Sequence, residues 1–206
     1  MTCWFDAGAR MVFVYTVRCR FTDSTREQAW NAWYGGPKIV QMLSLPYFRT
    51  CQRFRRATGV GRDYLALWTV LKPEAMTTPE YRAQWGFSEW EPFITDWSRD
   101  LFDGRPADED AFAVKPSGAL QVVSFEGMDA AQATDAQARL ARSRPGMMWL
   151  PIAGLDRHTP LIGLKVLPDA GARPHDLSGE GIREAVYRPL SDQHKRAADA
   201  GGATAA

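Results

Sequence analysis

The sequence has few of the residues by which catalytic and metal centres are usually recognised. Its 206 residues include three cysteines and three histidines, and none of them has the spacing of a metal site or a redox motif. The stretch GVGRDY (59–64) has only two glycines and is expected in a hairpin turn, so it is no dinucleotide-binding loop. The sequence therefore predicts no metal site and no flavin or nicotinamide cofactor.

The chain also lacks a charge excess and a long apolar run. Lysine and arginine total 25 and aspartate and glutamate total 24, so no overall field attracts nucleic acid or an acidic membrane. The early apolar run MVFVYTV (11–17) is too short to span a bilayer and has no cleavage pattern. An odd number of cysteines argues against a disulfide framework. We expect a cytoplasmic protein without nucleic-acid or membrane partners.

What the sequence does contain is one order of elements, used twice. The first half predicts a strand at 11–21, a helix opened by Ser24 and Glu27 and stopped at Gly35-Gly36-Pro37, and a hairpin of strands at 47–58 and 64–71. The second half predicts a strand at 119–127, a helix at 128–143, a hairpin across 147–168 and a last strand at 184–190. This order indicates an internal duplication.

The tryptophan-rich stretch WGFSEWEPFITDW (85–97) needs its own interpretation. Thr78 is the expected cap of a short preceding helix, and Ser88 with Glu91 forms a capping box for a second one. The apolar residues then fall at helical spacing: Trp90, Phe93, Ile94, Trp97 and Leu101. This stripe predicts a helix packed on a sheet. Trp85 and Phe87 lie outside the stripe and are candidates for a pocket rim.

These elements predict an α+β protein built from two tandem ferredoxin-like repeats. The first repeat spans residues 11–108 and the second spans 109–190. The polar, small-residue-rich segment 191–206 is predicted to be a disordered tail.

The segments WNAWYGGPKIVQMLSLPYF (30–48), YLALWTV (64–70) and TPEY (78–81) carry a resemblance to a known group. The pattern is similar to EthD-like and antibiotic-biosynthesis-monooxygenase-like members of the dimeric α+β barrel superfamily. The resemblance implies two ferredoxin-like units packed sheet to sheet, and it favours a homodimer, although a tandem duplication supplies both halves within one chain. It also implies a choice among muconolactone-type isomerases, polyketide cyclases, cofactor-independent monooxygenases and haem-binding enzymes.

Strand alternation suggests a substrate-binding face. Arg49, Arg53 and Arg55 share one face of the strand at 47–58, and arginine forks match carboxylates. If the leucines of YLALWTVL meet the helices, Tyr64 and Trp68 face the space between the sheets, and these two with Trp85 are the expected walls. The alternative interpretation is a solvated edge strand whose arginines discourage aggregation.

Three residues are candidates for proton transfer. His158 and Asp63 lie at matching hairpin turns of the two repeats, and Tyr34 stands at the end of the first helix. The alternatives are ordinary turn residues and a packed aromatic side chain. Haem would need His158 or His175 as a single axial ligand.

We therefore expect a cofactor-free isomerase that acts on a small planar unsaturated carboxylate from aromatic-compound catabolism. It needs only an anion clamp, one base and a desolvated pocket. Two alternatives stay open: a cofactor-independent monooxygenase or polyketide cyclase, and a non-catalytic protein for small-molecule binding or protein interaction.

Overall fold

The computed structural model describes residues 12–104, 109–169, 171 and 181–197, and these form two units in chain order. The elements of the first unit are β1 (Phe13–Phe21), α1 (Glu27–Trp33), a π-helical segment (Tyr34–Lys38), α2 (Ile39–Leu43), β2 (Phe48–Gly59), β3 (Tyr64–Val70), a 3-10 turn (Pro73–Met76), α3 (Pro79–Gln84), a second 3-10 turn (Ser88–Phe93) and β4 (Ile94–Phe102). The elements of the second unit are β5 (Ala119–Phe125), α4 (Ala130–Ala141), β6 (Met148–Leu155), β7 (Leu161–Leu167) and β8 (Ile182–Pro189), followed by a short strand β9 (His194–Lys195).

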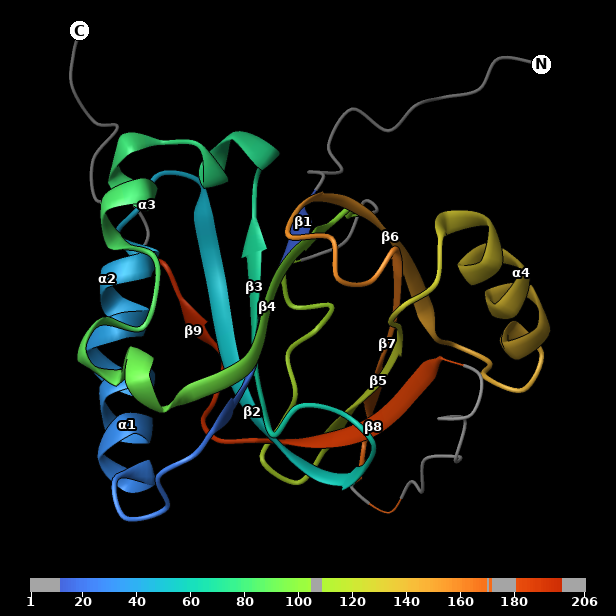
Figure 1. Ribbon diagram of the computed structural model, residues 1–206, viewed down its shortest axis with the longest axis horizontal. Coiled ribbons are helices and arrows are strands. Elements are labelled where there is room, and N and C mark those ends of the chain that lie inside the picture. Colours follow the sequence, from blue (N-terminus) through green and yellow to red (C-terminus); the bar gives the residue numbers. More distant parts are fainter. Residues whose placement is uncertain (1–11, 105–108, 170, 172–180, 198–206) are drawn as a thin grey trace, which may run out of the picture.

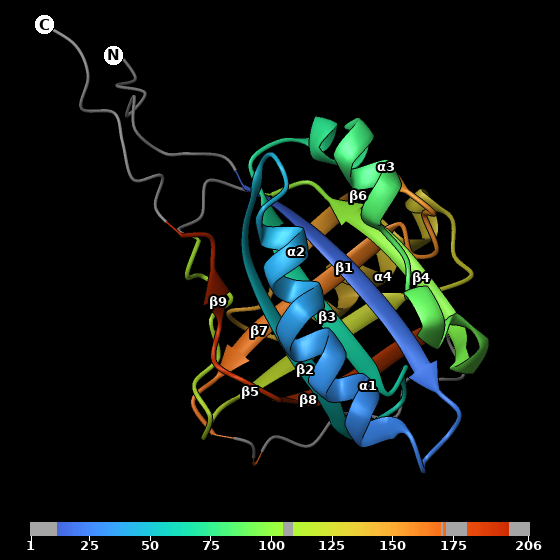
Figure 2. The same ribbon diagram turned by 90° about the vertical axis from the view of Figure 1, so that its left-hand side faces the viewer.

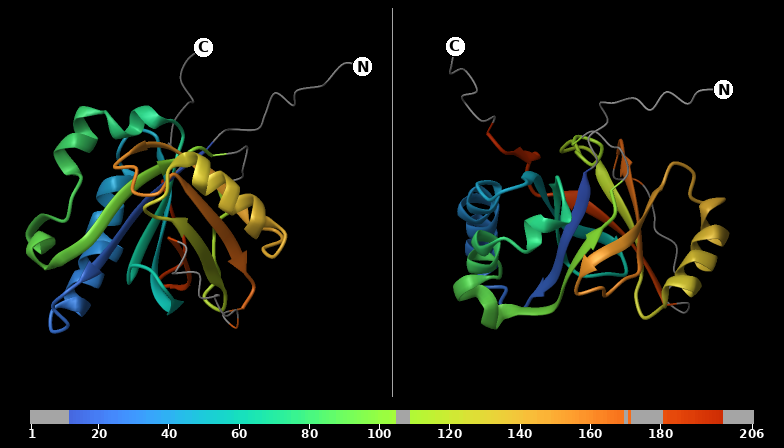
Figure 3. Two further views of the ribbon diagram at one scale, coloured as in Figure 1. Left: turned by 45° about the vertical axis from the view of Figure 1, so that its right-hand side comes forward. Right: turned by 90° about the horizontal axis from the view of Figure 1, so that it is seen from above.

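Eight antiparallel strands close into a barrel. The first unit has the strand order β2-β3-β1-β4, and the second has the matching order β6-β7-β5-β8. The units join at their edges, where β4 pairs with β6 and β2 pairs with β8. Helices α1 to α3 cover one side of the barrel and α4 covers the opposite side (Figures 1 and 3). The predicted α+β fold of two tandem ferredoxin-like units is confirmed, and the barrel closes within one chain.

The two faces of the first sheet are both buried, and their orientation corrects the prediction. Leu65 and Leu67 of β3 point into the barrel interior, where they join the apolar core that includes Val14 and Phe54. Tyr64 and Trp68 instead belong to the cluster that contains helical residues such as Trp30. All seven residues of β3 are buried, so alternation of apolar residues could not distinguish the two sides.

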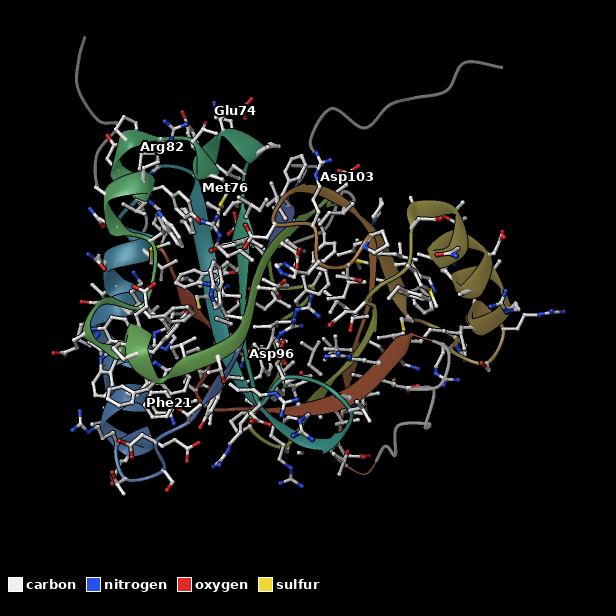
Figure 4. The ribbon with its side chains drawn as sticks, viewed as in Figure 1. Phe21, Glu74, Met76, Arg82, Asp96 and Asp103 are labelled. Atoms are coloured by element: carbon white, nitrogen blue, oxygen red, sulfur yellow. The ribbon has the colours of Figure 1, made fainter. Side chains whose placement is uncertain are left out.

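The helix-facing side of the first sheet is packed with large aromatic rings. Phe21, which is labelled in Figure 4, stacks on Trp30 of α1 with ring centroids 4.7 Å apart. Phe48 and Trp68 meet edge to face at 5.7 Å, and Phe48 stacks on Tyr81 at 6.0 Å. Figure 2 shows α1 and α2 lying across this sheet. These contacts fix the helices on the sheet, because offset-stacked and edge-to-face ring pairs stabilise the packing beyond what burial of apolar area contributes.

The connector between the units fills part of the barrel interior. Phe112 and Val114 are buried in the interior cluster. The Gln52 side chain donates to the Val114 carbonyl at 2.8 Å and accepts from the Val114 amide at 2.9 Å. The segment between β4 and β5 therefore contributes to the core.

The first helix does not begin or end as predicted. Arg26 occupies its N-cap position without a side-chain cap, so the Ser24–Glu27 capping box does not form. The chain also continues through Gly35-Gly36-Pro37 as a π-helical segment into α2. Pro37 lacks an amide hydrogen, and a widened turn accommodates it within the helical run. The Thr78 cap of α3 is confirmed, since its side chain accepts from the Tyr81 amide at 3.2 Å.

The predicted helix over 88–101 is wrong. Only residues 88–93 are helical, in a 3-10 turn, and β4 follows from Ile94. A bulge opposite β1 interrupts the strand near Asp96, whose φ is +46°. The bulge breaks the two-residue alternation, which left Ile94, Trp97 and Leu101 at a spacing that imitates a helix. This stretch supplies the edge strand that pairs with the second unit.

The end of the chain departs from the predicted disordered tail in one respect. Cys51 of β2 pairs with His194 of β9, so residues 194–195 add a short strand to the sheet. Residues 198–206 lie outside the described part of the chain. None of the helices in the described segments has the length and apolar character needed to cross a bilayer.

Candidate functional site

A narrow aromatic pocket lies between the first sheet and its helices. Its free volume is about 20 Å³, which is room for about one water molecule. The lining residues come from β1, β3, β4, the helical run and the segment after α3: Tyr15, Val17, Trp68, Trp97, Arg99, Tyr34, Lys38, Met42, Trp85, Gly86 and Phe87. Strand pairing explains part of the set, because Tyr15 stands opposite Trp68 and Val17 stands opposite Arg99. We call this space the inner pocket.

A larger groove opens beside the inner pocket. Its volume is about 550 Å³, and it is lined by Trp33, Pro37, Lys38, Gln41, Ala83, Gln84, Trp85 and Ser88. This volume falls in the usual range for small-molecule sites. We call this larger space the outer groove. Lys38 and Trp85 line both the outer groove and the inner pocket, so the two spaces share a wall.

Lys38 is the ionisable group at that shared wall. It ends the π-helical segment and is only 6% exposed. Its Nζ donates to the backbone carbonyl of Gln84 and lies 5.9 Å from the centroid of the Trp33 ring, and no described carboxylate pairs with it. Burial lowers the pKa of Lys38 to about 8, because water stabilises the ammonium form better than this apolar site does. At a pKa of about 8, about a tenth of the amine is neutral at pH 7 and about half is neutral at pH 8.

Arg99 is the second cation of the inner pocket. Its guanidinium lies 4.0 Å from the centroid of Trp85 and 5.8 Å from that of Trp97. Asp156 holds it by an ion pair of 3.0 Å between Nη2 and Oδ1. Nη1 donates to the hydroxyl of Tyr81 at 3.4 Å.

Two tyrosine hydroxyls meet beside Arg99. The Tyr15 and Tyr81 oxygens are 3.1 Å apart and buried. Burial raises the pKa of Tyr15 well above its ordinary value of 10 and also raises that of Tyr81. Both phenols therefore stay protonated at neutral pH and can donate hydrogen bonds.

Four of the residues singled out from the sequence come together at the inner pocket. Tyr34, Trp68, Trp85 and Phe87 line it. Tyr34 is 4% exposed, and burial raises its pKa far above 10, so the structure favours a wall over a proton donor. Trp68 reaches the pocket because its face of β3 meets the helices, which is the opposite of the expected orientation.

Arg53 and Tyr64 border a separate small cavity of about 10 Å³. Tyr34 lines both this cavity and the inner pocket. Arg53 donates to the Asn31 carbonyl at 3.1 Å and to the Asn31 side chain at 2.9 Å, and it lies 4.3 Å from the Tyr34 ring centroid. The guanidinium is thus committed to the protein in this conformation, where it ties β2 to α1.

The other predicted residues lie elsewhere. Arg49 pairs with Glu109 at 2.7 Å and Arg55 pairs with Glu27 at 3.3 Å. Asp63 pairs with Arg56 at 2.6 Å, and the exposed His158 stands in the turn after β6. None of these four lines the inner pocket or the outer groove. The predicted clamp and the predicted bases are therefore not assembled at one site.

Sequence reasoning missed Lys38, Arg99, Tyr15 and Tyr81. Lys38 directly follows Gly35-Gly36-Pro37, where the first helix is predicted to stop, and Arg99 lies in the wrongly predicted helix. An available signal was the lysine enclosed by apolar residues in PKIVQML (37–43), since an isolated charge in an apolar helical run needs a reason.

Metal and haem sites find little support in the described segments. There, no group of three histidine, cysteine, aspartate or glutamate side chains could hold a metal ion. His158, one predicted haem ligand, is exposed and lines neither space. His175, the other one, lies outside the described residues.

Comparison with known proteins identifies the fold. No protein-family model matches the sequence, and no curated protein matches it. A solved structure described as an anthrone oxidase-like protein superposes with a TM-score of 0.56 at 12% identity, over 95% of this chain and 97% of the other. A protein provisionally named a chlorite dismutase gives 0.48 at 12% identity, over 88% and 95% of the two chains. A provisionally named monooxygenase from Lactobacillus acidophilus gives 0.42 at 8%, over 85% and 94%.

The chain shares its fold with the anthrone oxidase-like protein, and both of its ferredoxin-like units close one barrel within a single polypeptide. This confirms the predicted fold resemblance. At 12% identity the likeness shows the fold alone.

Proposed function

We propose that this protein is a cofactor-independent oxygenase that converts a planar, fused-ring CH₂ ketone into a quinone. The ring would lie against Trp85 in the outer groove, with its reacting edge at the inner pocket. The single observation that carries the proposal is Lys38, a buried amine without a carboxylate partner among the described residues, placed where two aromatic-lined spaces meet. The match to an anthrone oxidase-like protein supports the substrate class.

Lys38 serves as the base in this proposal. A neutral amine is needed to take a proton from carbon, and burial lowers the Lys38 pKa to about 8. A general base works best when its pKa lies near the pH of the reaction, because enough of it is then unprotonated and it is still basic enough to take a proton. The resulting ammonium remains beside the anion that it has formed.

Arg99 and Tyr15 serve as the groups that stabilise the enolate oxygen. Both line the inner pocket, and the Arg99 charge is held in place by Asp156. Fixed donors in a dry site favour an oxyanion more than mobile water does. Enolisation of the ketone is therefore the step that the protein accelerates.

The enolate then reacts with dioxygen without a cofactor. A carbon–oxygen bond forms, and a proton from Lys38 completes a hydroperoxide. Loss of the second hydrogen from that carbon as a proton breaks the oxygen–oxygen bond and releases hydroxide, which a proton converts to water. In sum, the CH₂ group and one O₂ give one carbonyl group and one water. Dioxygen is the only oxidant required.

The isomerase predicted from the sequence stays a prediction, and the site gives it less support. It needs a carboxylate clamp, whereas Arg49, Arg53 and Arg55 each have a partner within the chain. The enolisation step is common to both reactions, so a spectral change without oxygen uptake would distinguish the isomerase.

The test is oxygen consumption with anthrone as the substrate. We expect one O₂ consumed per anthraquinone formed, at a rate well above spontaneous oxidation, and unchanged by EDTA or by added flavin or NADPH. With ¹⁸O₂, the new carbonyl should carry label. Heat-denatured protein gives the background rate. A rate equal to that background for anthrone and its hydroxylated derivatives would refute the proposal.

A further inference from the structure

The turn between β6 and β7 reaches from the second unit onto Arg99 of the first. The Asp156 carboxylate accepts from Arg99 Nη2 at 3.0 Å and from Nε at 3.2 Å. It also accepts from the Arg99 amide at 3.2 Å, and the Asp156 amide donates to the Arg99 carbonyl at 2.9 Å. One aspartate therefore fixes both the backbone and the side chain of Arg99.

The backbone around Asp156 is held in an unfavourable conformation. Leu155 has φ +67° and Arg157 has φ +55°, values that residues other than glycine and asparagine rarely adopt. The turn is pinned at both ends: Leu155 packs against the aromatic core of the first unit, and the His158 amide donates to Asp100 Oδ1 at 2.8 Å. Surrounding contacts of this kind can sustain backbone strain.

From Arg99 the hydrogen bonds continue to the wall of the inner pocket. Nη1 donates to the Tyr81 hydroxyl at 3.4 Å, and the Tyr81 and Tyr15 hydroxyls are 3.1 Å apart. The guanidinium plane also lies over Trp85 at 4.0 Å. Four elements, the β6–β7 turn, β4, α3 and β1, thus meet in one connected chain of polar groups.

We propose that Asp156 is a positioning residue, through which the second unit sets the orientation of Arg99 at the inner pocket of the first. A planar guanidinium gripped by two carboxylate oxygens has a fixed plane, whereas an arginine without that grip samples many rotamers. With the grip in place, Nη1 stays directed at Tyr81. The effect on turnover rests on the proposed function, but the effect on Arg99 geometry does not.

The experiment compares Asp156→Asn with a matched control. Asn keeps the shape but removes the charge that grips both guanidinium nitrogens. The control is Glu109→Gln, which alters another half-buried arginine–carboxylate pair: the side chains of Arg99 and Asp156 are 18% and 21% exposed, and those of Arg49 and Glu109 are 28% and 24%. Glu109 lines neither the inner pocket nor the outer groove.

Two readouts are taken on the full chain. Near-ultraviolet circular dichroism and tryptophan emission need no substrate, and both sum over the eight tryptophans of the chain. A difference between Asp156→Asn and wild type reports the tryptophans beside Arg99, which are Trp85 and Trp97. Steady-state kinetics with anthrone report kcat and KM. We expect Asp156→Asn to change both spectra and to lower kcat about 10-fold, because a misplaced group is costly in a pre-organised site. Glu109→Gln should change neither. If Asp156→Asn fails to fold, Arg99→Lys takes its place. This variant keeps the charge without the fork that Asp156 grips, and it should change both spectra relative to wild type.

The outcomes separate the two proposals. Changed spectra with lower kcat support the positioning role. If Asp156→Asn changes the spectra but the wild-type protein does not oxidise anthrone, the positioning role is supported and the oxygenase is refuted. Unchanged spectra in folded Asp156→Asn, or in Arg99→Lys where the aspartate variant does not fold, overturn the positioning role. So does an equal spectral change in Glu109→Gln.

Discussion

The two units share a strand order but differ in what lies between sheet and helix. In the first unit, α1 and the run that follows it bury bulky side chains such as Trp30, Tyr34 and Met42. In the second unit, α4 buries only Ala133 and Ala136. There the Trp149 ring and Met147 lie so close to Gly163 that an added Cβ would meet them at 2.5 and 2.6 Å. The aromatic packing of the first unit leaves an inner pocket and an outer groove, whereas Trp149 and Met147 pack tightly against Gly163 in the second unit.

This difference suggests a division of roles after duplication. The first unit carries the candidate site, and the second supports it by pairing β6 with β4 and by placing Asp156 on Arg99. A fold built from two matching halves does not need chemistry in both halves. One half is free to become a rigid support, which is what a pre-organised site requires.

The largest difference between the two units is expected when the buried amine of Lys38 is removed. We expect Lys38→Met to lower anthrone oxidation about 100-fold, within the usual range for loss of a general base. Methionine keeps the length of the side chain and fills the apolar surroundings. Oxygen uptake under saturating substrate gives the rate.

The matched control lies in the second unit. Lys165 also donates its Nζ to a backbone carbonyl, that of Pro145 at 2.6 Å, but far along the sequence from the candidate site. Lys165→Met should retain wild-type turnover. Equal losses in the two variants, or no loss in Lys38→Met, would contradict the role of Lys38.

The tight packing around Gly163 predicts an asymmetric response of the two units to added methyl groups. Gly163→Ala should destabilise the protein by about 1–3 kcal/mol, because Trp149 and Met147 must move. In the first unit, Gly35→Ala meets only Arg53 Nη1 at 3.8 Å, an ordinary contact. It should stabilise by about 0.5 kcal/mol through lower unfolded-state entropy.

Urea unfolding of the two variants measures this difference directly. If Gly163→Ala unfolds with a free energy equal to or higher than that of Gly35→Ala, the second unit is less tightly packed around Gly163 than the contacts indicate.

Sequence patterns predicted the duplication and most strands, because those segments have clear turn residues and β-branched content. They could not assign the faces of the first sheet, since β3 is buried on both sides. They also failed at β4, where the bulge at Asp96 hides the strand period. Barrel closure depends on this edge strand, so the error concealed how the units join.

The candidate site was predictable only in part. Tyr34, Trp68 and Trp85 were singled out as aromatic residues and do line the inner pocket. Arg99, Tyr81 and Asp156 come from separate elements that approach each other only in the folded barrel. No local pattern marks such a set, because each residue alone resembles a surface charge or a packed tyrosine.

Trp85, in the wall shared by the inner pocket and the outer groove, should contribute more to ligand binding than to the stability of the fold. Trp85 is 42% exposed, so we expect Trp85→Ala to leave the melting temperature nearly unchanged. Affinity for a water-soluble anthraquinone sulfonate should fall about 10-fold, through loss of stacking and apolar contact. Fluorescence titration measures the dissociation constant. Trp149→Ala in the second unit is the control, and it should lower stability while leaving affinity intact; the reverse pattern would place the ligand elsewhere.

The smallest expected effect concerns stability as a function of pH. The pKa of Lys38 is about 8 in the folded protein and near 10.5 when unfolded. Between these values the unfolded chain binds a proton that the folded chain does not, so the contribution of Lys38 to stability rises with pH. Below about pH 8 the buried ammonium is a penalty, on the order of 1 kcal/mol after allowance for screening by water.

Lys38→Met removes this penalty and isolates it from other groups. Burial also raises the pKa of Cys19 to about 12 and that of Tyr15 above 10, which lowers stability at high pH in both proteins equally. We therefore expect the variant to be more stable than wild type at pH 7, with an advantage that shrinks toward pH 10. Urea unfolding at intervals of pH measures the difference, with Lys165→Met as the comparison. A constant difference across this range would show that Lys38 titrates normally, and the first unit would then lack the neutral amine on which its proposed chemistry depends.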